Sequence, residues 1–375
     1  MGNMPLEADV DPTMSPRRIL LYCVLSAQGG IETHILALSA ALAAAGHLVT
    51  VGAKSAESLA LYRERFNRLG VAFVVAPEPP KALRTGRLRS LGDLWRTATL
   101  FWLLWPGRFD LVALHAGGTA GRLLRQLVGP QGRLTYHEHV AGVPQLLQRP
   151  AYRALLAHCD FVTANSIEDA VMLRRAARQT HHLMALTVPP PTPVKSCTRE
   201  RGAMFRVGFV GNLEAAEKGA LRLWDLWRAT PPLDCELHFF GRGDVPGTVG
   251  TKPPANVILH GPFPREDVGS IFAKIDLLVH PAEQESLGLV LIEAMAYGVP
   301  FLCTRVGGMV ALTEGNPDAG FTQADNASLC SSIASMKQSV ERGEIQPQRL
   351  RDRYESNFGP TSLGQRWVSL YASEY

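Results

Sequence analysis

Short apolar runs alternate with amphipathic stretches along most of the chain. The apolar run from Ile19 to Leu25 is followed by glycines and by a stripe with helical spacing from Ile31 to Leu42. A second apolar run, from Leu48 to Val51, comes next. Buried parallel strands are typically continuous apolar runs, and a surface helix has apolar residues three or four positions apart. This segment therefore predicts a strand, a helix and a parallel strand.

The same alternation continues in both halves of the chain. Further strands are predicted at 71–75, 110–114, 134–137, 161–163, 205–210, 236–240, 257–259, 276–279 and 300–303. Helices are predicted at 221–227, 268–273, 289–296 and 363–371. Ser166 followed by Asp169 predicts a capped helix start. Alternating strands and helices are typical of doubly wound α/β domains.

A proline-rich break divides the chain. Residues 189–193 include four prolines, which favour a stiff extended connector. We predict a disordered tail over 1–16, a domain over 17–190, a linker over 191–204, a second domain over 205–360 and a final helix over 361–375 that packs back toward the first domain. Doubly wound sheets bind ligands at the carboxyl ends of their strands, so two facing domains would form a cleft.

Composition limits the function. The 375 residues are 46% hydrophobic and 19% charged with a net charge of +4, which argues against disorder and against a nucleic-acid partner. The six cysteines include no C-x-x-C pair, so we expect neither a disulfide framework nor a zinc site built on cysteine. The first residues have no apolar signal region, and the most apolar stretch, 94–105, is too short to span a membrane. A cytoplasmic protein is predicted.

Residues 81–108 mix six basic residues with leucines and tryptophans. That mixture suits an interfacial helix on an anionic membrane, which would make the protein peripheral on the inner membrane face. The alternative is an ordinary amphipathic helix packed on a sheet with its charges in water. Composition alone leaves both open.

Glu285 and Glu293 flank the start of a predicted helix. If most of the interval is helical, the two carboxylates lie about 12 Å apart, too far to share a proton or a metal. The separation suits the two ends of a nucleotide-sugar, with the helix N-terminus offering N–H groups to the diphosphate. Alternatively, one glutamate is solvated and the other pairs on its helix.

Glycine-containing turns follow three predicted strands. The turn 211–219 ends with Lys218 and Gly219 after an apolar strand, a position from which a lysine could bind a departing diphosphate. Gly29 and Gly30 precede the first helix, where close backbone approach of an anion is possible, and 117–121 is a similar loop. Each turn alone is weak evidence.

Thr135-Tyr136-His137-Glu138-His139 ends a predicted strand. Two histidines around a glutamate could bind a metal or exchange protons, but a third ligand at metal-like spacing is missing. We therefore expect no metal, and a histidine that contacts a substrate hydroxyl. The remaining histidines, including His181-His182, are expected to have structural or surface roles.

In this order, these pieces resemble the retaining glycosyltransferases of family 4, which have the GT-B fold. The resemblance extends over about residues 17–373. Its specific part is the run from Glu285 to Met295, which looks like the E-x7-E signature of that family, continued by 298–300 and 306–308. The segments 29–32 and 135–137 look like its opening and its acceptor-side histidine motif.

The resemblance implies an N-terminal acceptor domain and a C-terminal nucleotide-sugar domain, both Rossmann-like, facing across a cleft. It implies catalytic roles for His137, Glu285 and Lys218. It implies a sugar-donor site made of Gly29, Gly30, Asn212, Lys218, Ser286, Leu287, Gly288, Leu289 and Glu293. The enzyme would transfer a hexose or N-acetylhexosamine from a UDP- or GDP-sugar to a saccharide or lipid-linked acceptor in polysaccharide or glycolipid biosynthesis. No cofactor or metal would be required.

Three departures from the family pattern keep alternatives open. Asn212 stands where a second phosphate-binding arginine is usual, Ser286 replaces a glycine, and Ala311 replaces a common glutamate. A non-enzymatic or partner-dependent subunit that keeps the fold is one alternative. Another enzyme on the same fold, a phosphorylase-like transferase or a sugar-nucleotide epimerase, is the other.

Overall fold

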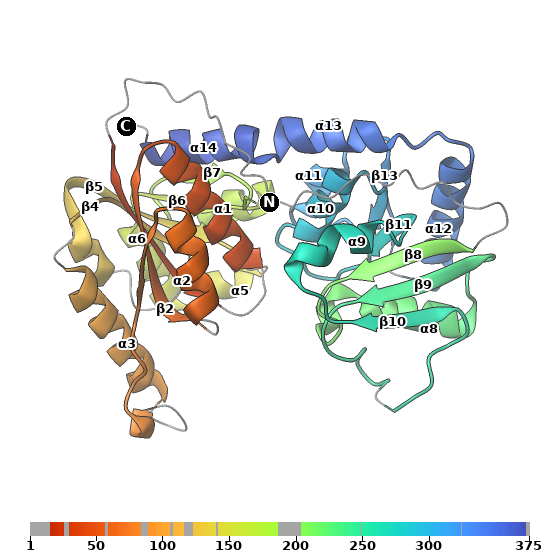
Figure 1. The fold of residues 1–375 in the computed structure, drawn as a ribbon, viewed down its shortest axis with the longest axis horizontal. Coiled ribbons are helices and arrows are strands. Elements are labelled where there is room, and N and C mark those ends of the chain that lie inside the picture. The colour runs from red at the N-terminus through yellow and green to blue at the C-terminus, as the bar shows by residue number, and fades with distance from the viewer. Residues whose placement is uncertain are drawn as a thin grey trace. The chain divides into compact units, whose positions relative to one another are not determined.

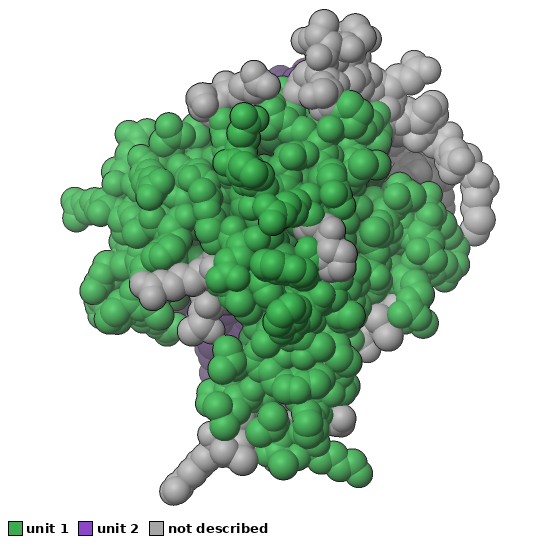
Figure 2. Space-filling view, turned by 90° about the vertical axis from the view of Figure 1, so that its left-hand side faces the viewer, with its two compact units in different colours: residues 1–188, 359–375 green, residues 189–358 purple. Residues whose placement is uncertain are grey.

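The chain forms two compact units, residues 1–188 with 359–375 (unit 1) and residues 189–358 (unit 2). The computed structural model describes residues 16–25, 30–56, 59–83, 89–105, 108–115, 123–139, 142–186, 204–248, 250–323 and 325–372. The tail over 1–16 and the linker over 191–204 lie almost wholly outside this described part. Figures 1 and 2 show the two units.

Unit 1 is built on a seven-stranded sheet in the order β3-β2-β1-β4-β5-β6-β7, with all paired strands parallel. The strands are β1 (Arg18–Leu25), β2 (Leu48–Ala56), β3 (Ala72–Val75), β4 (Phe109–Leu114), β5 (Val128–Glu138), β6 (Phe161–Ala164) and β7 (Thr180–His182). The helices are α1 (Gly30–Ala44), α2 (Leu59–Arg68), α3 (Arg89–Leu104), α5 (Val143–Leu147), α6 (Pro150–His158), α7 (Ile167–Leu173) and α14 (Pro360–Ala372).

Both faces of this sheet are covered, which explains why its strands are continuous apolar runs. Ile19 and Leu21 of β1 pack into a core with α1 and α14, while Leu20 and Tyr22 pack into a second core with α3 and α6. The predicted cap is present, because the Ser166 hydroxyl accepts the Asp169 N–H at 3.0 Å. β7, which contains His181 and His182, was not predicted from the sequence.

The C-terminal helix α14 belongs to unit 1 although unit 2 precedes it in the chain. Its Trp367 is fully buried against α1, and the indole N–H donates to the Met184 carbonyl at 2.8 Å. α3 lies at the left of unit 1 in Figure 1, the side that faces the viewer in Figure 2. Within the described part of the chain, none of the helices is long and apolar enough to cross a bilayer.

Unit 2 contains a six-stranded parallel sheet in the order β10-β9-β8-β11-β12-β13. Its strands are β8 (Phe205–Val210), β9 (Cys235–Phe240), β10 (Val257–Gly261), β11 (Leu277–His280), β12 (Phe301–Cys303) and β13 (Ala319–Phe321). Its helices are α8 (Ala220–Ala229), α9 (Val268–Phe272), α10 (Leu289–Tyr297), α11 (Met309–Thr313), α12 (Asn326–Glu341) and α13 (Pro347–Asn357).

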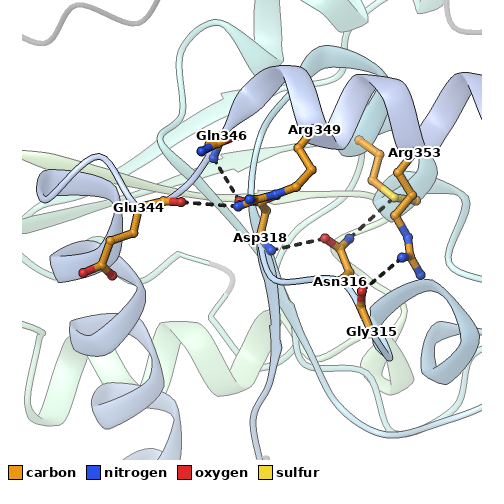
Figure 3. Close-up of polar contacts among 8 residues, drawn as sticks. Gly315, Asn316, Asp318, Glu344, Gln346, Arg349 and Arg353 are labelled. Atoms are coloured by element: carbon orange, nitrogen blue, oxygen red, sulfur yellow. Dashed lines mark hydrogen bonds and ion pairs between the residues drawn. The ribbon is translucent and has the colours of Figure 1, made fainter.

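A buried carboxylate fastens α13 to unit 2 (Figure 3). Asp318 is completely buried and accepts two hydrogen bonds from Arg349 and one from the Gln346 N–H. The Asp318 N–H donates to Asn316, whose amide contacts the sulfur of Met295 on α10 at 3.8 Å. These contacts join β13, α13 and α10, the helix that also contains Glu293.

Candidate active site

The carboxyl ends of β8 and β11 meet at the switch point of the unit 2 sheet. β9 and β10 lie on one side of this strand pair and β12 and β13 on the other, the arrangement at which doubly wound sheets bind ligands. The loops after the two strands touch, since the Glu283 N–H donates to the Glu217 carbonyl at 2.7 Å. A Cβ atom at Gly219 would lie 2.3 Å from the Pro281 carbonyl oxygen, so this approach requires glycine.

The two loops bring Lys218, Glu285 and His280 together. The Lys218 Nζ lies 2.7 Å from Glu285 Oε2, and His280 Nε2 lies 3.1 Å from the same oxygen. His280 ends β11 and is buried. Burial alone would raise the pKa of Glu285, but the hydrogen bond and charge of His280, and then Lys218, lower that pKa to about 2. Glu285 is therefore a carboxylate at neutral pH.

Lys218 and Glu285 were predicted from the sequence, whereas His280 was given no role. A histidine at the end of an apolar strand, five residues before Glu285, was the available signal. The structure brings all three to one point from two separate loops.

The loop from Glu285 to Gly288 lies against a glycine pair. The Gly308 N–H donates to the Ser286 carbonyl at 2.7 Å, and a Cβ at Gly307 would lie 1.9 Å from the Glu285 carbonyl oxygen. Gly288, at φ +77°, precedes the first residue of α10, Leu289. The Ser286 N–H donates to the Glu285 side chain at 3.1 Å. The loop thus places the N-terminus of α10 beside the Lys218–Glu285 pair.

Glu293 lies on α10 and is paired with Arg265 of the one-turn helix η5 (Arg265–Asp267). Arg265 Nη1 donates to Glu293 Oε1 at 2.8 Å, and the glutamate side chain is 9% exposed. The predicted helix at 289–296 is present as α10, which begins at Leu289, so the part of the 285–293 interval before Leu289 is a loop. Each glutamate has its own cation. Arg265 was missed by the sequence analysis, and no local signal marked it.

Asn212 follows β8, and its side chain accepts the Glu214 N–H at 3.3 Å. This contact shapes the turn in which the residue lies. The neighbouring cation is Arg222 of α8, which donates to the Pro281 carbonyl at 2.7 Å and pairs with Glu283. Leu287 is buried, and Ala311 lies on α11.

Unit 1 gathers four histidines. His34 is on α1, His115 follows β4, and His137 and His139 come from the end of β5. The ring centroids of His34 and His137 are 5.2 Å apart, and those of His137 and His139 are 4.3 Å apart. Trp367 of α14 contacts His34 and His137 at centroid distances of 4.9 and 5.0 Å. Gly30 begins α1, whereas Gly29 and 117–121 lie outside the described residues.

These histidines are neutral at physiological pH. Burial, followed by the neighbouring imidazoles, lowers the pKa of His34, His115 and His137 well below the usual value. Burial lowers the pKa of His139 to about 3. His137 Nδ1 lies 2.7 Å from the Thr163 hydroxyl, and His115 Nδ1 lies 3.1 Å from His139 Nε2.

One ring nitrogen from each of His34, His137 and His139 lies within 4.8 Å of the others. His34 is thus the third potential ligand, which sequence spacing did not provide. The chemistry of this set does not suit a metal. His34 Nδ1 accepts the Leu186 N–H at 2.8 Å, so the ring hydrogen is on Nε2. Histidine ligands usually do the reverse and donate the second ring N–H to an oxygen.

Comparison with known proteins identifies the family to which the chain belongs. Residues 28–182 match the family described as Glycosyltransferase Family 4, and residues 205–338 match the one described as Glycosyl transferases group 1. The chain belongs to the family 4-like glycosyltransferases. The predicted family and GT-B fold are confirmed.

Two relatives span most of this glycosyltransferase. 2-Deoxystreptamine N-acetyl-D-glucosaminyltransferase from Streptomyces fradiae is 29% identical over 343 residues, 76% of each chain. Phosphatidyl-myo-inositol mannosyltransferase from Propionibacterium freudenreichii subsp. shermanii is 25% identical over 375 residues, 94% of each chain. The crystal structure of Anabaena HepE with UDP and glucose shares the fold, with a TM-score of 0.73, 17% identity and coverage of 96% of this chain and 100% of that one.

Proposed function

We propose that this glycosyltransferase transfers a sugar from UDP or GDP to a hydroxyl of a saccharide or lipid-linked acceptor, with retention and without a metal. The arrangement of Lys218, Glu285 and His280 at the unit 2 switch point carries the proposal. It combines a lysine, a carboxylate paired with it and a helix N-terminus, which together suit a sugar diphosphate. Polysaccharide or glycolipid biosynthesis is the proposed setting.

Each residue then has a stated task. Lys218 exchanges Glu285 for the diphosphate, and His280 keeps Glu285 oriented and compensated when Lys218 leaves. Glu285 accepts hydrogen bonds from the transferred sugar, and Glu293, held by Arg265, accepts them from the ribose. The first turn of α10 stabilises the charge that develops on the leaving group.

The reaction breaks the bond between the anomeric carbon and the diphosphate oxygen and forms a bond from that carbon to the acceptor oxygen. The acceptor attacks on the face from which the diphosphate departs, so the configuration is retained. The leaving phosphate takes the acceptor proton. Positive charge from Lys218 and α10 supports departure.

We also propose that α3 contacts a membrane. Five apolar side chains of α3 and its end, the α3 patch, are exposed: Leu91 49%, Leu94 54%, Trp102 68%, Leu103 52% and Trp105 44%. Residues 81–108 contain six basic residues and one acidic residue. Tryptophan beside basic charge suits an anionic lipid surface. Free thiols at the five described cysteines, all but Cys197, agree with a cytoplasmic location on the inner face.

Thermal unfolding with UDP, GDP, ADP and NAD, each with and without EDTA, tests the transferase proposal. Ligand at 100 times its dissociation constant adds about 2.7 kcal/mol of stability. We expect UDP or GDP to raise the midpoint despite EDTA, and Lys218→Ala to abolish this rise while Lys252→Ala, an exposed control, keeps it. No shift with any nucleotide would instead support the partner-subunit alternative, and a shift lost with EDTA would contradict the metal-free site.

Sedimentation with lipid vesicles tests the membrane contact. We expect binding to phosphatidylglycerol vesicles and not to phosphatidylcholine, with loss in Trp102→Ser. Leu233→Ser is the matched control, because Leu233 is 82% exposed on unit 2. Equal binding by the two variants would refute a role for the α3 patch.

A further inference from the structure

Glu285 lies on a loop, so its position depends on what that loop contacts. β11 ends at His280 and α10 begins at Leu289, and the residues between them, 281–288, form neither strand nor helix. His280 and Lys218 contact the Glu285 carboxylate itself. The backbone of the loop before Glu285 has to be held by other residues.

Arg222 of α8 makes two contacts with the first part of this loop. Its Nη1 donates to the Pro281 carbonyl at 2.7 Å, and its Nη2 forms an ion pair with Glu283. The Arg222 side chain is 23% exposed, whereas that of Glu283 is 62% exposed. A planar guanidinium binds two acceptors in a fixed geometry. Arg222 thus holds the loop at two points, four and two residues before Glu285.

Arg222 and Lys218 belong to one short segment. Arg222 lies in the first turn of α8, four residues after Lys218. The Glu283 N–H also donates to the carbonyl of Glu217, the residue before Lys218, at 2.7 Å. The segment therefore contacts the Glu285 carboxylate through Lys218 and the loop that carries it through Arg222.

The two cations differ in how readily they can exchange partners. The Lys218 ammonium pairs with a single carboxylate, which phosphate oxygens can replace. The Arg222 guanidinium binds a carbonyl and a carboxylate of the loop, and both contacts would have to break before it could bind a ligand. Exchange is therefore easier for Lys218 than for Arg222.

We propose that Arg222 is a positioning residue that holds Glu285 in place for the transferred sugar when Lys218 binds the diphosphate. The inference rests on the proposed transferase function and adds a residue that acts through Glu285. His280 orients the carboxylate, and Arg222 fixes the loop that carries it.

Isothermal titration calorimetry and turnover test Arg222→Ala. Among UDP-glucose, UDP-N-acetylglucosamine and GDP-mannose, we expect the dissociation constant of the nucleotide-sugar that binds to rise about 10-fold. That of the matching UDP or GDP should stay within about twofold, because Lys218 and α10 are intact. We expect kcat to fall about 10- to 100-fold, since a misplacement of about 1 Å can have this effect. Arg222→Lys, which can keep one of the two contacts, should recover part of both losses.

Arg228→Ala is the matched control. Arg228 is on the same helix, pairs with Asp225 at 2.9 Å and has a side chain that is 70% exposed. Equal changes in Arg222→Ala and Arg228→Ala would overturn the proposal. An equal loss of affinity for nucleotide-sugar and nucleoside diphosphate in Arg222→Ala would overturn it too. If the parent protein binds none of these nucleotides, the transferase function fails and this inference fails with it.

Hydrogen exchange by mass spectrometry tests the loop without a ligand, because Lys218→Ala imitates the departure of the lysine. We expect the 281–288 segment to stay protected in Lys218→Ala and to lose protection when Arg222→Ala is added. Protection of α10 should be the same in both, which shows that unit 2 is folded. Addition of Arg228→Ala to Lys218→Ala is the control. Similar exchange of the 281–288 segment in the two double variants would overturn the role of Arg222.

Discussion

The switch points of the two sheets satisfy their polar groups in opposite ways. In unit 2 the charged groups are paired, as in Lys218 with Glu285 and Arg265 with Glu293. In unit 1 the polar groups are neutral imidazoles, and two of them have a buried nitrogen without a described partner. Similar sheets therefore support two kinds of recognition. A cation paired with a carboxylate can exchange that partner for an anionic ligand, whereas a neutral N–H suits an uncharged hydroxyl.

Acid should separate the two sites most strongly, because it destabilises both but over different pH ranges. The folded pKa of each buried histidine is lowered from 6.5, so below pH 6.5 the unfolded chain binds protons that the folded chain does not. His34, His115 and His137 therefore destabilise the folded protein below pH 6.5, and the loss grows as the pH falls. Glu285, with a pKa of about 2, contributes stability above about pH 4.5 that is lost only as the pH falls toward 2.

Hydrogen exchange by mass spectrometry, corrected for intrinsic rates, separates the two units. Between pH 7 and 5 we expect protection in α1 and β5 to fall well before protection in α10. Parallel loss of protection in both units would contradict the two separate pH ranges.

The buried charge of unit 2 is tested next. Asp318→Ala leaves Arg349 without its carboxylate and the Gln346 N–H without an acceptor (Figure 3). We expect a loss of about 3–5 kcal/mol in the unfolding free energy, measured in urea. Asp352 lies on the exposed side of α13, the helix that contains Arg349. The unfolding free energy of Asp352→Ala should stay within about 0.5 kcal/mol of the parent. A comparable loss of unfolding free energy in both variants would show that the buried Asp318–Arg349 pair has no special contribution to stability.

The smallest change is the removal of one cation or carboxylate at the switch point. Lys218→Ala and Glu285→Ala should each lower turnover about 100- to 1000-fold, the usual effect of losing one group that stabilises developing charge. Circular dichroism should show a folded protein in each case. Undiminished turnover in either variant would refute the role assigned to that residue.

Local patterns were enough to predict most of the fold. Parallel strands buried on both faces are apolar runs, so β1 and β8 were visible, and Ser166 marked a helix start. The strands β7 (Thr180–His182) and β13 (Ala319–Phe321) are not apolar runs, unlike the equally short β12 (Phe301–Cys303), so the sequence pattern did not predict them. The contact of α14 with α1 is a tertiary feature, and it was inferred from one helical segment with a tryptophan.

The candidate site was predicted residue by residue rather than as a geometry. Lys218 stood out in a turn with glycine at both ends, and Glu285 in the run that resembles the family 4 signature. Their pairing depends on the approach of two loops at Gly219 and Pro281. His34 could not be found from spacing. It lies far along the chain from both His137 and Leu186, whose N–H fixes its tautomer, and only the folded sheet brings them together.

The position of α14 has a consequence for synthesis of the protein on the ribosome. All 170 residues of unit 2, 189–358, are translated before the helix that covers α1. At about 5–20 residues per second this takes roughly 10 to 35 s. During that time Leu38 and the rest of its core cluster are not covered by Trp367. His34 and His137 likewise lack the Trp367 ring that packs against them. Unit 1 begins first and is completed last.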